Sequence, residues 1–454
     1  MNSLLKLFAL GAMIFIAACS TYNPENEILE ADRTPPMGYD PVFISNVSNN
    51  ASSTDIAKAF VSRIDMRDPS KLKFYIHVVD SNYDFISGLS PDKVKDLWCG
   101  FRRTTNFDVW TDDYEIYEVK PITAGDHSVA LVMDHSGSMG EQRALAVQNA
   151  AENFINRKKD KDKIALIKYD YRIGIEASLS DNKDHLKSKL QKNGLAGYGA
   201  TTASSDAVHK AVQELAQLND DSRKIVMVFT DGYDNSSNIS LDSVITYAVQ
   251  NGVIICGIDF GYNVLPNYLE KLTSETGGIY HHIYGTHEFD LVFDDVYNRL
   301  YNYYVLEIPQ PNFGEHHIAI DICPPGQKFT IEAEFNNMPH IGEVTLLNVY
   351  FDTNSDKIKT ESQPAIDRVG ALLMLNKDMT IELRGHTDSD GDENHNLDLS
   401  KRRAEAVKNA LIKYGISENR ITWKGFGESM PVADNNNNKG RSKNRRTEFI
   451  IRKQ

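Results

Sequence analysis

Two charged residues near the carboxy terminus have the chemistry of a clamp for a zwitterion. Asp388 follows the strand-like run Thr380 to Gly385, and Arg403 lies at the amino-terminal end of the predicted helix Leu399 to Tyr414. A carboxylate accepts hydrogen bonds from an ammonium, and a planar guanidinium holds a carboxylate through two parallel bonds. The pair therefore predicts a pocket for a ligand that carries both an ammonium and a carboxylate.

A second set of polar residues has the chemistry of a site for a hard divalent cation. Asp134, Ser136 and Ser138 alternate along one loop directly after an apolar strand, and Asp231 follows another such strand. Magnesium prefers oxygen ligands, keeps bound waters and tolerates few carboxylates. We expect Mg²⁺ here, with another divalent cation as the alternative, and with enough residual charge to attract an acidic side chain from a partner.

Nothing in the sequence places a catalytic nucleophile. The chain shows no motif of the Ser-His-Asp or Cys-His type and no Gly-rich phosphate loop. His135, inside the candidate metal loop, is expected to be a bystander. The sequence therefore predicts a binding protein and not an enzyme.

The elements that position the metal-site candidates alternate between buried strands and helices. The expected strands are Ser128 to Met133, Ile164 to Ile167, Ile225 to Phe229 and Val253 to Ile258. This alternation is typical of a mostly parallel sheet with helices on both faces, in which ligands bind at the carboxyl ends of the strands. Asp134 and Asp231 should converge at that edge.

Half-buried strands are predicted on both sides of this α/β segment. They are Leu72 to Val79 and Tyr114 to Val119 before it, and Tyr303 to Ile308, His317 to Ile322 and Phe329 to Phe335 after it. Because few strands flank either side, we favour one β-sandwich-like domain into which the α/β domain is inserted. Two separate β modules are the alternative.

The amino terminus reads as an export signal. A short apolar run, Leu7 to Ala18, is followed by Cys19, and this pattern resembles a bacterial lipobox in which the cysteine is acylated. A plain secretory signal is the alternative, and the run is short for a transmembrane helix. The resemblance to lipoproteins also implies retention at the outer rather than the inner membrane, because Ser20 and not an Asp follows the cysteine.

The predicted organisation therefore has six segments. They are residues 1–18, a signal peptide; 19–40, a lipidated tether; 41–123, the first part of the β-rich domain; 124–300, the α/β domain; 301–341, the second β-rich part; and 342–454, a small α+β domain.

Composition and cysteine content limit the classes of partner. The 454-residue chain is 41% hydrophobic and 25% charged, with a net charge of −14, which argues against nucleic acid as a ligand. Cys256 lies in an apolar run and is expected to be a buried thiol. Cys99 and Cys323 would be able to form a disulfide in an oxidising compartment, a pairing that the sequence leaves open.

Around the candidate metal loop, the chain resembles the von Willebrand factor A (VWA) domain with its metal-ion-dependent adhesion site. Asp134, Ser136 and Ser138 match the first loop of that family and Asp231 its later aspartate. The resemblance places the family's threonine at Thr202, with Thr201 as a close rival. It implies a doubly wound α/β fold that binds a protein partner through the metal.

From about Leu346 to Gln454, the chain resembles the OmpA-like peptidoglycan-binding domain. The similarity is carried by the segments 385–388, 396–404 and 444–446. It implies that Asp388 and Arg403 hold the diaminopimelate of the cell-wall stem peptide. Asn354, Asn396 and Arg445 are expected to line the same pocket.

Together these features predict a lipoprotein that is anchored in the outer membrane, faces the periplasm and binds peptidoglycan. Its α/β domain would display a metal site to an unidentified protein partner. The alternative is a surface adhesin that binds a host or matrix protein.

Overall fold

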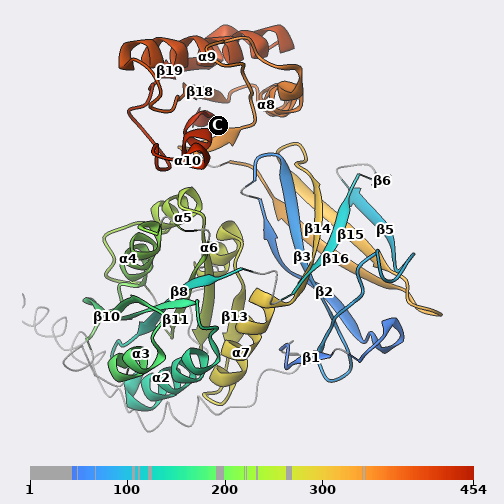
Figure 1. The fold of residues 1–454 in the computed structure, drawn as a ribbon, viewed down its shortest axis with the longest axis vertical. Helices are drawn as coiled ribbons and strands as arrows, with labels where there is room; N and C mark the ends of the chain where they lie inside the picture. Colours follow the sequence, from blue (N-terminus) through green and yellow to red (C-terminus); the bar gives the residue numbers. More distant parts are fainter. Residues whose placement is uncertain are drawn as a thin grey trace, which may run out of the picture.

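The computed structural model describes residues 43–48, 50–66, 68–104, 108–110, 113–120, 125–190, 199–218, 220, 222–231, 234–261, 268–339, 341–342 and 344–453. These residues form a β-sandwich, an α/β domain and a carboxy-terminal α+β domain (Figure 1). The predicted multidomain fold class is confirmed. The predicted signal peptide, Cys19 and the tether lie outside the described residues.

Strands from both sides of the α/β domain pair in the same two sheets of the sandwich. One sheet has the order β1-β4-β3-β14-β7, with β2 also pairing with β3, and the other has the order β16-β15-β5-β6. The strands are β1 (Val47–Ser48), β2 (Lys58–Asp65), β3 (Lys71–Val79), β4 (Phe85–Ile86), β5 (Trp98–Thr104), β6 (Asp108–Trp110), β7 (Glu115–Val119), β14 (Tyr303–Pro309), β15 (Glu315–Ile322) and β16 (Phe329–Asn336), with the 3-10 helix η1 (Ser53–Asp55) before β2. The α/β domain therefore interrupts a single sandwich.

The two sheets of the sandwich enclose one hydrophobic core. Phe74 on β3 and Leu306 on β14 pack with Phe101 on β5 and Ile320 on β15, and each of these side chains is buried. A disulfide joins Cys99 on β5 to Cys323 after β15 and thus links residues that lie 224 positions apart. The pairing that the sequence left open is present in the structure.

The α/β domain is built on a six-stranded sheet with the order β10-β9-β8-β11-β12-β13. All neighbouring pairs are parallel except β10 with β9. The strands are β8 (His127–Asp134), β9 (Lys163–Tyr169), β10 (Ile173–Ser180), β11 (Arg223–Thr230), β12 (Val253–Phe260) and β13 (Tyr280–Ile283). Every residue of β8 is buried, as expected for a central strand covered on both faces.

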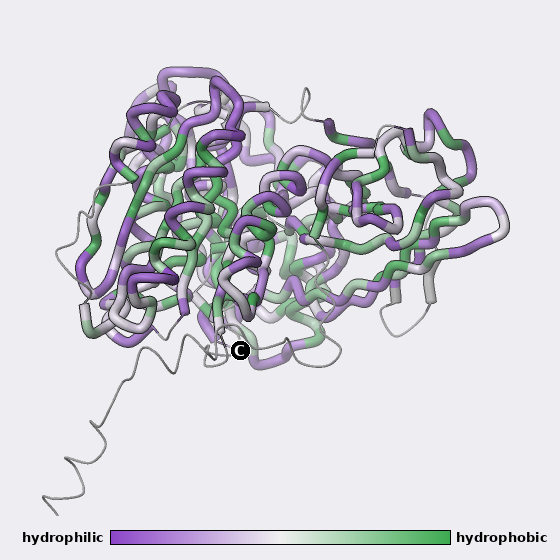
Figure 2. Tube along the Cα trace, turned by 90° about the horizontal axis from the view of Figure 1, so that it is seen from below, coloured by the Kyte–Doolittle hydropathy of each residue, from purple (hydrophilic) through white to green (hydrophobic). Residues whose placement is uncertain are grey.

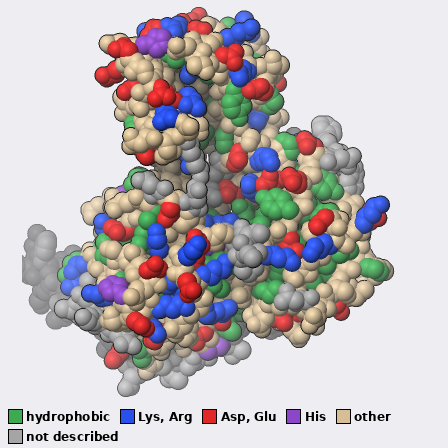
Figure 3. Space-filling view, viewed as in Figure 1, with side chains coloured by type: hydrophobic (Ala, Val, Ile, Leu, Met, Phe, Trp, Pro, Cys, Tyr) green, Lys and Arg blue, Asp and Glu red, His purple; other side chains and the backbone are tan. Residues whose placement is uncertain are grey.

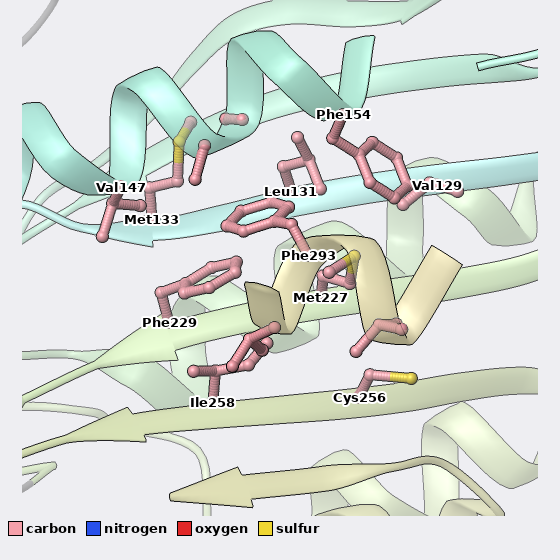
Figure 4. Packing of buried hydrophobic residues seen from close by; sticks show 14 of the residues in the cluster. Val129, Leu131, Met133, Val147, Phe154, Met227, Phe229, Cys256, Ile258 and Phe293 are labelled. Atoms are coloured by element: carbon pink, nitrogen blue, oxygen red, sulfur yellow. The ribbon is translucent and has the colours of Figure 1, made fainter. Parts of the chain in front are cut away.

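Helices cover both faces of this sheet. They are α2 (Gly140–Arg157), α3 (Lys183–Leu190), α4 (Ser204–Ala216), α5 (Leu241–Gln250), α6 (Tyr268–Thr276) and α7 (Glu288–Tyr301). One face packs against α2, α3 and α7, and Figure 4 shows Phe154 and Phe293 of that layer above the strands. The other face packs against α4, α5 and α6. Cys256 is a free, fully buried thiol, as predicted.

The carboxy-terminal domain packs helices against a four-stranded sheet with the order β17-β20-β18-β19. Its elements are β17 (Val344–Leu347), η2 (Thr360–Ser362), α8 (Gln363–Leu375), β18 (Thr380–Gly385), α9 (Glu393–Tyr414), η3 (Glu418–Arg420), β19 (Ile421–Gly425), α10 (Asn438–Asn444) and β20 (Thr447–Lys453). The helix α9 begins earlier than predicted, because Asp392 caps its amino terminus by accepting a hydrogen bond from the backbone of His395. It ends at Gly415, which adopts a positive φ of 113°.

Polar residues lie mainly at the outer turns and helix surfaces, and hydrophobic residues follow the strands (Figure 2). On the face seen in Figure 3, acidic and basic side chains are interspersed over all three domains. Among the described residues, no helix combines the length and the apolar character needed to cross a membrane.

Candidate functional site

The first loop of the candidate metal site folds around the carboxylate of Asp134. This residue ends β8 and is 1% exposed. Its Oδ1 accepts a hydrogen bond from the backbone N–H of Ser136 at 2.8 Å, and its Oδ2 accepts one from the hydroxyl of Thr230 at 2.7 Å. The carboxylate is thus fixed at the carboxyl edge of the sheet between the ends of two adjacent parallel strands.

A chain of hydroxyl groups connects this loop to Asp231. The hydroxyls of Ser136 and Ser138 lie 3.1 Å apart, and Ser138 donates a hydrogen bond to Asp231 Oδ1 at 2.7 Å. Asp231 directly follows β11, which pairs with β8. Four of the predicted metal-site residues are therefore brought together, as parallel strand ends require.

A third segment carries the predicted threonine to the same loop. Gly199 forms a bridge with Ser136, and a side chain at Gly199 would place its Cβ 2.4 Å from Asp170 Oδ2, so only glycine allows this approach. The backbone N–H of Thr202 donates to Asn235 Oδ1 at 2.8 Å. Thr202 is buried and Thr201 is partly exposed, and the choice of Thr202 over Thr201 stays a prediction.

The residues of this site fit a hard divalent cation. Burial, and then the charge of Asp231, raises the pKa of Asp134 to about 7. Asp134 accepts hydrogen bonds from the backbone amide of Ser136 and from the hydroxyls of Thr230 and Ser136, and it forms no ion pair with a described cation that would offset this buried charge. The described residues contain no group of three His, Cys, Asp or Glu side chains suited to a metal. A cation at this position would therefore depend on hydroxyl and carboxylate oxygens, the ligands that Mg²⁺ prefers.

Two residues of this site were missed by the sequence analysis. Thr230 hydrogen-bonds Asp134, and Arg143, in the first turn of α2, donates to Asp231 Oδ2 at 2.9 Å. Thr230 was within reach because it directly precedes the predicted Asp231. Arg143 gave no signal, because its contact depends on how α2 packs over the strand ends.

In the carboxy-terminal domain, close packing of α9 against β18 assembles the candidate clamp. A Cβ at Gly385, the last residue of β18, would lie 2.1 Å from the carbonyl oxygen of Ser400 on α9. The segment after Gly385 is fixed by backbone bonds from His386 to Arg446 and from Thr387 to Gly427. Only glycine at position 385 permits this packing, which brings the loop with Asp388 to the helix with Arg403.

Asp388 and Arg403 are both buried, 7% and 8% exposed, but each has a different partner. Asp388 Oδ2 forms an ion pair with Arg445 at 2.5 Å. Arg403 lies in the middle of α9, which corrects its predicted place at the start of the helix, since α9 begins at Glu393. Its guanidinium donates to the carbonyl oxygens of Ser355 at 3.0 Å and Asp352 at 3.2 Å.

The three charges of the clamp influence one another. Burial lowers the pKa of Arg403, the nearby charge of Asp388 raises it, and that of Arg445 lowers it. The guanidinium of Arg403 also lies over the ring of Phe351, 5.0 Å from its centre. The side chain of Arg445 is 48% exposed and so is the one of the three charged groups most open to solvent.

The two predicted asparagines have different environments. Asn396 is buried in the first turn of α9, and its amide donates to the carbonyl oxygens of Asp388 and Asp390 and to Glu428 Oε2 at 2.7 Å. These bonds hold the loop that carries Asp388 against the first turn of α9. Asn354 is exposed, has a positive φ of 56° and lies with its Oδ1 2.9 Å from His395 Nε2. Glu428 is a further contact that the sequence analysis missed.

Family comparisons match the two regions that carry these sites. The family model of the von Willebrand factor type A domain matches residues 128–299, and that of the OmpA family matches residues 350–445. The first range contains the whole candidate metal site, and the second contains every residue predicted for the clamp.

Individual relatives share one part of the chain each. Outer membrane porin F of Pseudomonas aeruginosa is 36% identical over 29% of this chain and 38% of its own length. Outer-membrane lipoprotein YfiB of the same organism is 38% identical over 23% of this chain and 61% of its own length. A solved structure of proximal thread matrix protein 1 from the mussel byssus, with zinc in its MIDAS motif, is 20% identical with a TM-score of 0.36, and covers 43% of this chain and 49% of its own.

The chain thus spans less than two thirds of the length of these curated relatives. Each of these relatives and each of the two family models matches only part of the chain. Residues 128–299 are a von Willebrand factor type A domain, and residues 350–445 belong to the OmpA family.

Proposed function

We propose that this protein is a non-catalytic component of the bacterial cell envelope that holds peptidoglycan through its OmpA-family domain and presents a metal-dependent VWA domain to a protein partner. The ligand of the clamp is the diaminopimelate of the stem peptide. The observation that supports this proposal most directly is the burial of Asp388, in the loop after β18, near Arg403 on α9. Opposite charges held there without pairing to each other suit a ligand that carries both charges.

Each group of the clamp has a defined task in this proposal. Asp388 accepts the ligand's ammonium, which requires the exposed Arg445 to give up at least one bond to Asp388 Oδ2. Arg403 receives the ligand's carboxylate, and the carbonyl oxygens of Ser355 and Asp352 keep its guanidinium oriented. Once Arg445 has left Asp388, its side chain is long enough to reach the carboxylate of the ligand.

The envelope location rests on two attachments. Acylation of Cys19 would anchor the chain in the outer membrane, facing the periplasm, while the OmpA-family domain holds the wall. The relative YfiB is named an outer-membrane lipoprotein, which supports this location. Two attachments on one chain increase each other's effective concentration, so that moderate affinities suffice for lasting retention.

The VWA domain supplies the partner site. Asp134, Ser136, Ser138, Thr202 and Asp231 would hold Mg²⁺ or a similar divalent cation, and an acidic side chain of the partner would complete its coordination. The hydroxyl ligands are neutral, so only the carboxylates of Asp134 and Asp231 offset the charge of the bound ion. We expect no turnover of cell-wall fragments, because the sequence shows no motif of the Ser-His-Asp or Cys-His type that would supply a catalytic nucleophile.

Sedimentation with purified, diaminopimelate-containing peptidoglycan tests the clamp. Asp388→Ala and Arg403→Ala should each reduce the fraction bound at least tenfold, on the order of 1–3 kcal/mol for one charge-assisted bond. Asp398→Ala and Arg402→Ala are matched controls, since these exposed residues on α9 pair with each other. Both controls should sediment as the wild type does.

Competition identifies the recognised group. Free meso-diaminopimelate should release the wild-type protein from the wall, whereas cadaverine, which carries two ammonium groups and no carboxylate, should release far less. Equal release by the two compounds, or unchanged sedimentation of the folded Asp388→Ala and Arg403→Ala variants, would count against the clamp.

A further inference from the structure

Arg143 occupies an unusual position beside the candidate metal site. From the first turn of α2, its Nη1 donates to Asp231 Oδ2 at 2.9 Å and to the carbonyl oxygen of Ser138 at 3.2 Å. The guanidinium lies 4.9 Å from the centre of the Phe260 ring, and its side chain is 16% exposed. These contacts from three segments hold the positive charge against the site.

Both carboxylate oxygens of Asp231 are engaged by donors. Oδ1 accepts from the hydroxyl of Ser138 at 2.7 Å, and Oδ2 accepts from Arg143. A metal ion bound directly to Asp231 would share that carboxylate with the guanidinium of Arg143, whose charge repels the ion. Both oxygens of Asp134 are engaged as well, but its donors are the backbone amide of Ser136 and the hydroxyls of Thr230 and Ser136, none of which carries a charge.

Other strand ends along this edge of the sheet show the same contrast. Asp170, after β9, pairs with Arg172 at 2.6 Å, and Asp259, on β12, lies 2.6 Å from His282 Nδ1. Asp231 has Arg143. Asp134, between these residues, is the member of the row whose contacts contain no ionisable donor, which marks it as the carboxylate left for a metal ion.

We infer that Arg143 is a built-in cation of the metal centre that limits Asp231 to holding the ion through a bound water and leaves the metal-loaded site positively charged. This inference rests on the proposed metal-binding function of the VWA domain. Two carboxylates neutralise the charge of a divalent ion. The guanidinium of Arg143 adds one positive charge, so the net charge of the metal-loaded site is positive. The positive charge of Arg143 therefore weakens metal binding and strengthens the attraction between the site and a carboxylate-bearing ligand.

Calorimetric titration of the full chain with Mg²⁺ tests the first half of this inference. Arg143→Met removes the charge and keeps an apolar stem of similar length, and it should tighten Mg²⁺ binding about tenfold, because repulsion is lost and Asp231 is released. Arg143→Lys keeps the charge and should stay close to the wild type. Arg157→Met is the matched control, because it removes an arginine at the other end of α2 and should change nothing.

The outcomes separate the inference from the function on which it rests. If wild type binds Mg²⁺ and Asp134→Ala does not, the metal function stands. Unchanged or weaker binding by a folded Arg143→Met would then overturn the role of Arg143 alone, as would Arg143→Lys behaving like Arg143→Met. Absence of Mg²⁺ binding by the wild type would overturn both.

Water-proton relaxation of the Mn²⁺-loaded protein tests the second half. Glutarate, a simple dicarboxylate, should displace Mn²⁺-bound water from the wild type at a concentration at least several-fold lower than from Arg143→Met. Saturating Mn²⁺ in both samples removes the difference in metal affinity. Equal displacement in the two proteins would show that Arg143 does not attract the anion.

Discussion

Glu307 lies in the middle of β14, the strand that resumes the sandwich after the VWA domain, and it binds both neighbouring strands. Its carboxylate pairs with Lys71 at 2.6 Å and Lys73 at 2.7 Å, both on β3, and accepts from Tyr117 on β7 at 2.7 Å. Burial alone would raise the pKa of Glu307, but these three donors outweigh it and lower the pKa to about 2.

This network predicts acid-sensitive stability of the sandwich. Because the folded-state pKa lies below the value of about 4.3 in an unfolded chain, the stabilisation is present above that pH and is lost as the pH falls toward 2. Glu307→Gln should lower the free energy of unfolding by about 1–2 kcal/mol at pH 7, and the deficit should shrink at pH 3. Urea denaturation at both pH values measures it.

Glu332 on β16 serves as the control, because it is also a glutamate but is exposed and lies 4.0 Å from its partner His317. Glu332→Gln should leave stability near the wild-type value, because exposed pairs contribute little. A deficit of Glu307→Gln that stays constant from pH 7 to pH 3 would refute the assigned cause.

At the residue scale, the sequence indicated which candidate residues lie together better than it indicated the side chains that contact them. Asp134 and Asp231 could be placed because each follows an apolar strand, and parallel strands end at one edge. Arg143 and Glu428 could not, because their contacts depend on helix packing and loop geometry that spacing does not encode. The ion pair of Asp388 with Arg445 joins residues far apart in sequence, so sequence alone could predict a shared pocket but not this pairing.

At the element scale, strands were easier to predict than helix ends. The buried strands of the VWA sheet were found from their continuous apolar runs, whereas α9 begins at Glu393, before its apolar stripe. The first turn of α9 is polar and is fixed by the Asp392 cap, so hydrophobic periodicity missed it.

The disulfide between β5 and the end of β15 predicts a redox-dependent stability of the sandwich. It joins the parts of the sandwich on the two sides of the VWA domain. Because the VWA domain has a core of its own, the crosslink chiefly restricts the unfolded sandwich strands. Replacing both Cys99 and Cys323 with Ser should cost about 2–4 kcal/mol, or ~5–10 °C in the Tm of the sandwich.

Thermal unfolding with and without dithiothreitol measures this effect. The reduced wild type should melt at the temperature of the double variant, and the double variant should not respond to the reductant. The buried Cys256 is a thiol in both proteins and cancels in the comparison. A wild-type Tm that is indifferent to dithiothreitol would show that the crosslink does not stabilise the sandwich.

At the scale of the whole molecule, the structure resolves a choice that the sequence left open. The strand β14, which follows the VWA domain, pairs with both β3 and β7, which precede it. The structure therefore has one sandwich split by the VWA domain and not two modules. Sequence could favour this arrangement only by counting strands, because pairing partners separated by an entire domain leave no local pattern. The contact between the sandwich and the OmpA-family domain likewise had no signal in the sequence.

That contact is centred on Phe313, in the sandwich loop between β14 and β15. Its ring lies 5.8 Å from that of Phe449 on β20 and 4.4 Å from the guanidinium of Arg368 on α8. Arg368 also donates to the carbonyl oxygen of Pro69 in the sandwich at 3.1 Å, and burial lowers its pKa to about 10. An aromatic pair with a cation over one ring should be worth about 1–3 kcal/mol to docking.

Phe313→Ala should therefore release the OmpA-family domain from a fixed position while leaving its clamp intact. We expect small-angle X-ray scattering of the variant to show a larger radius of gyration, and faster proteolysis between β16 and β17, while sedimentation with peptidoglycan stays unchanged because Asp388 and Arg403 lie elsewhere. Leu375→Ala, at a side chain that is 79% exposed on α8, is the control and should match the wild type in both measurements. An unchanged scattering profile of Phe313→Ala would mean that other contacts hold the OmpA-family domain against the sandwich.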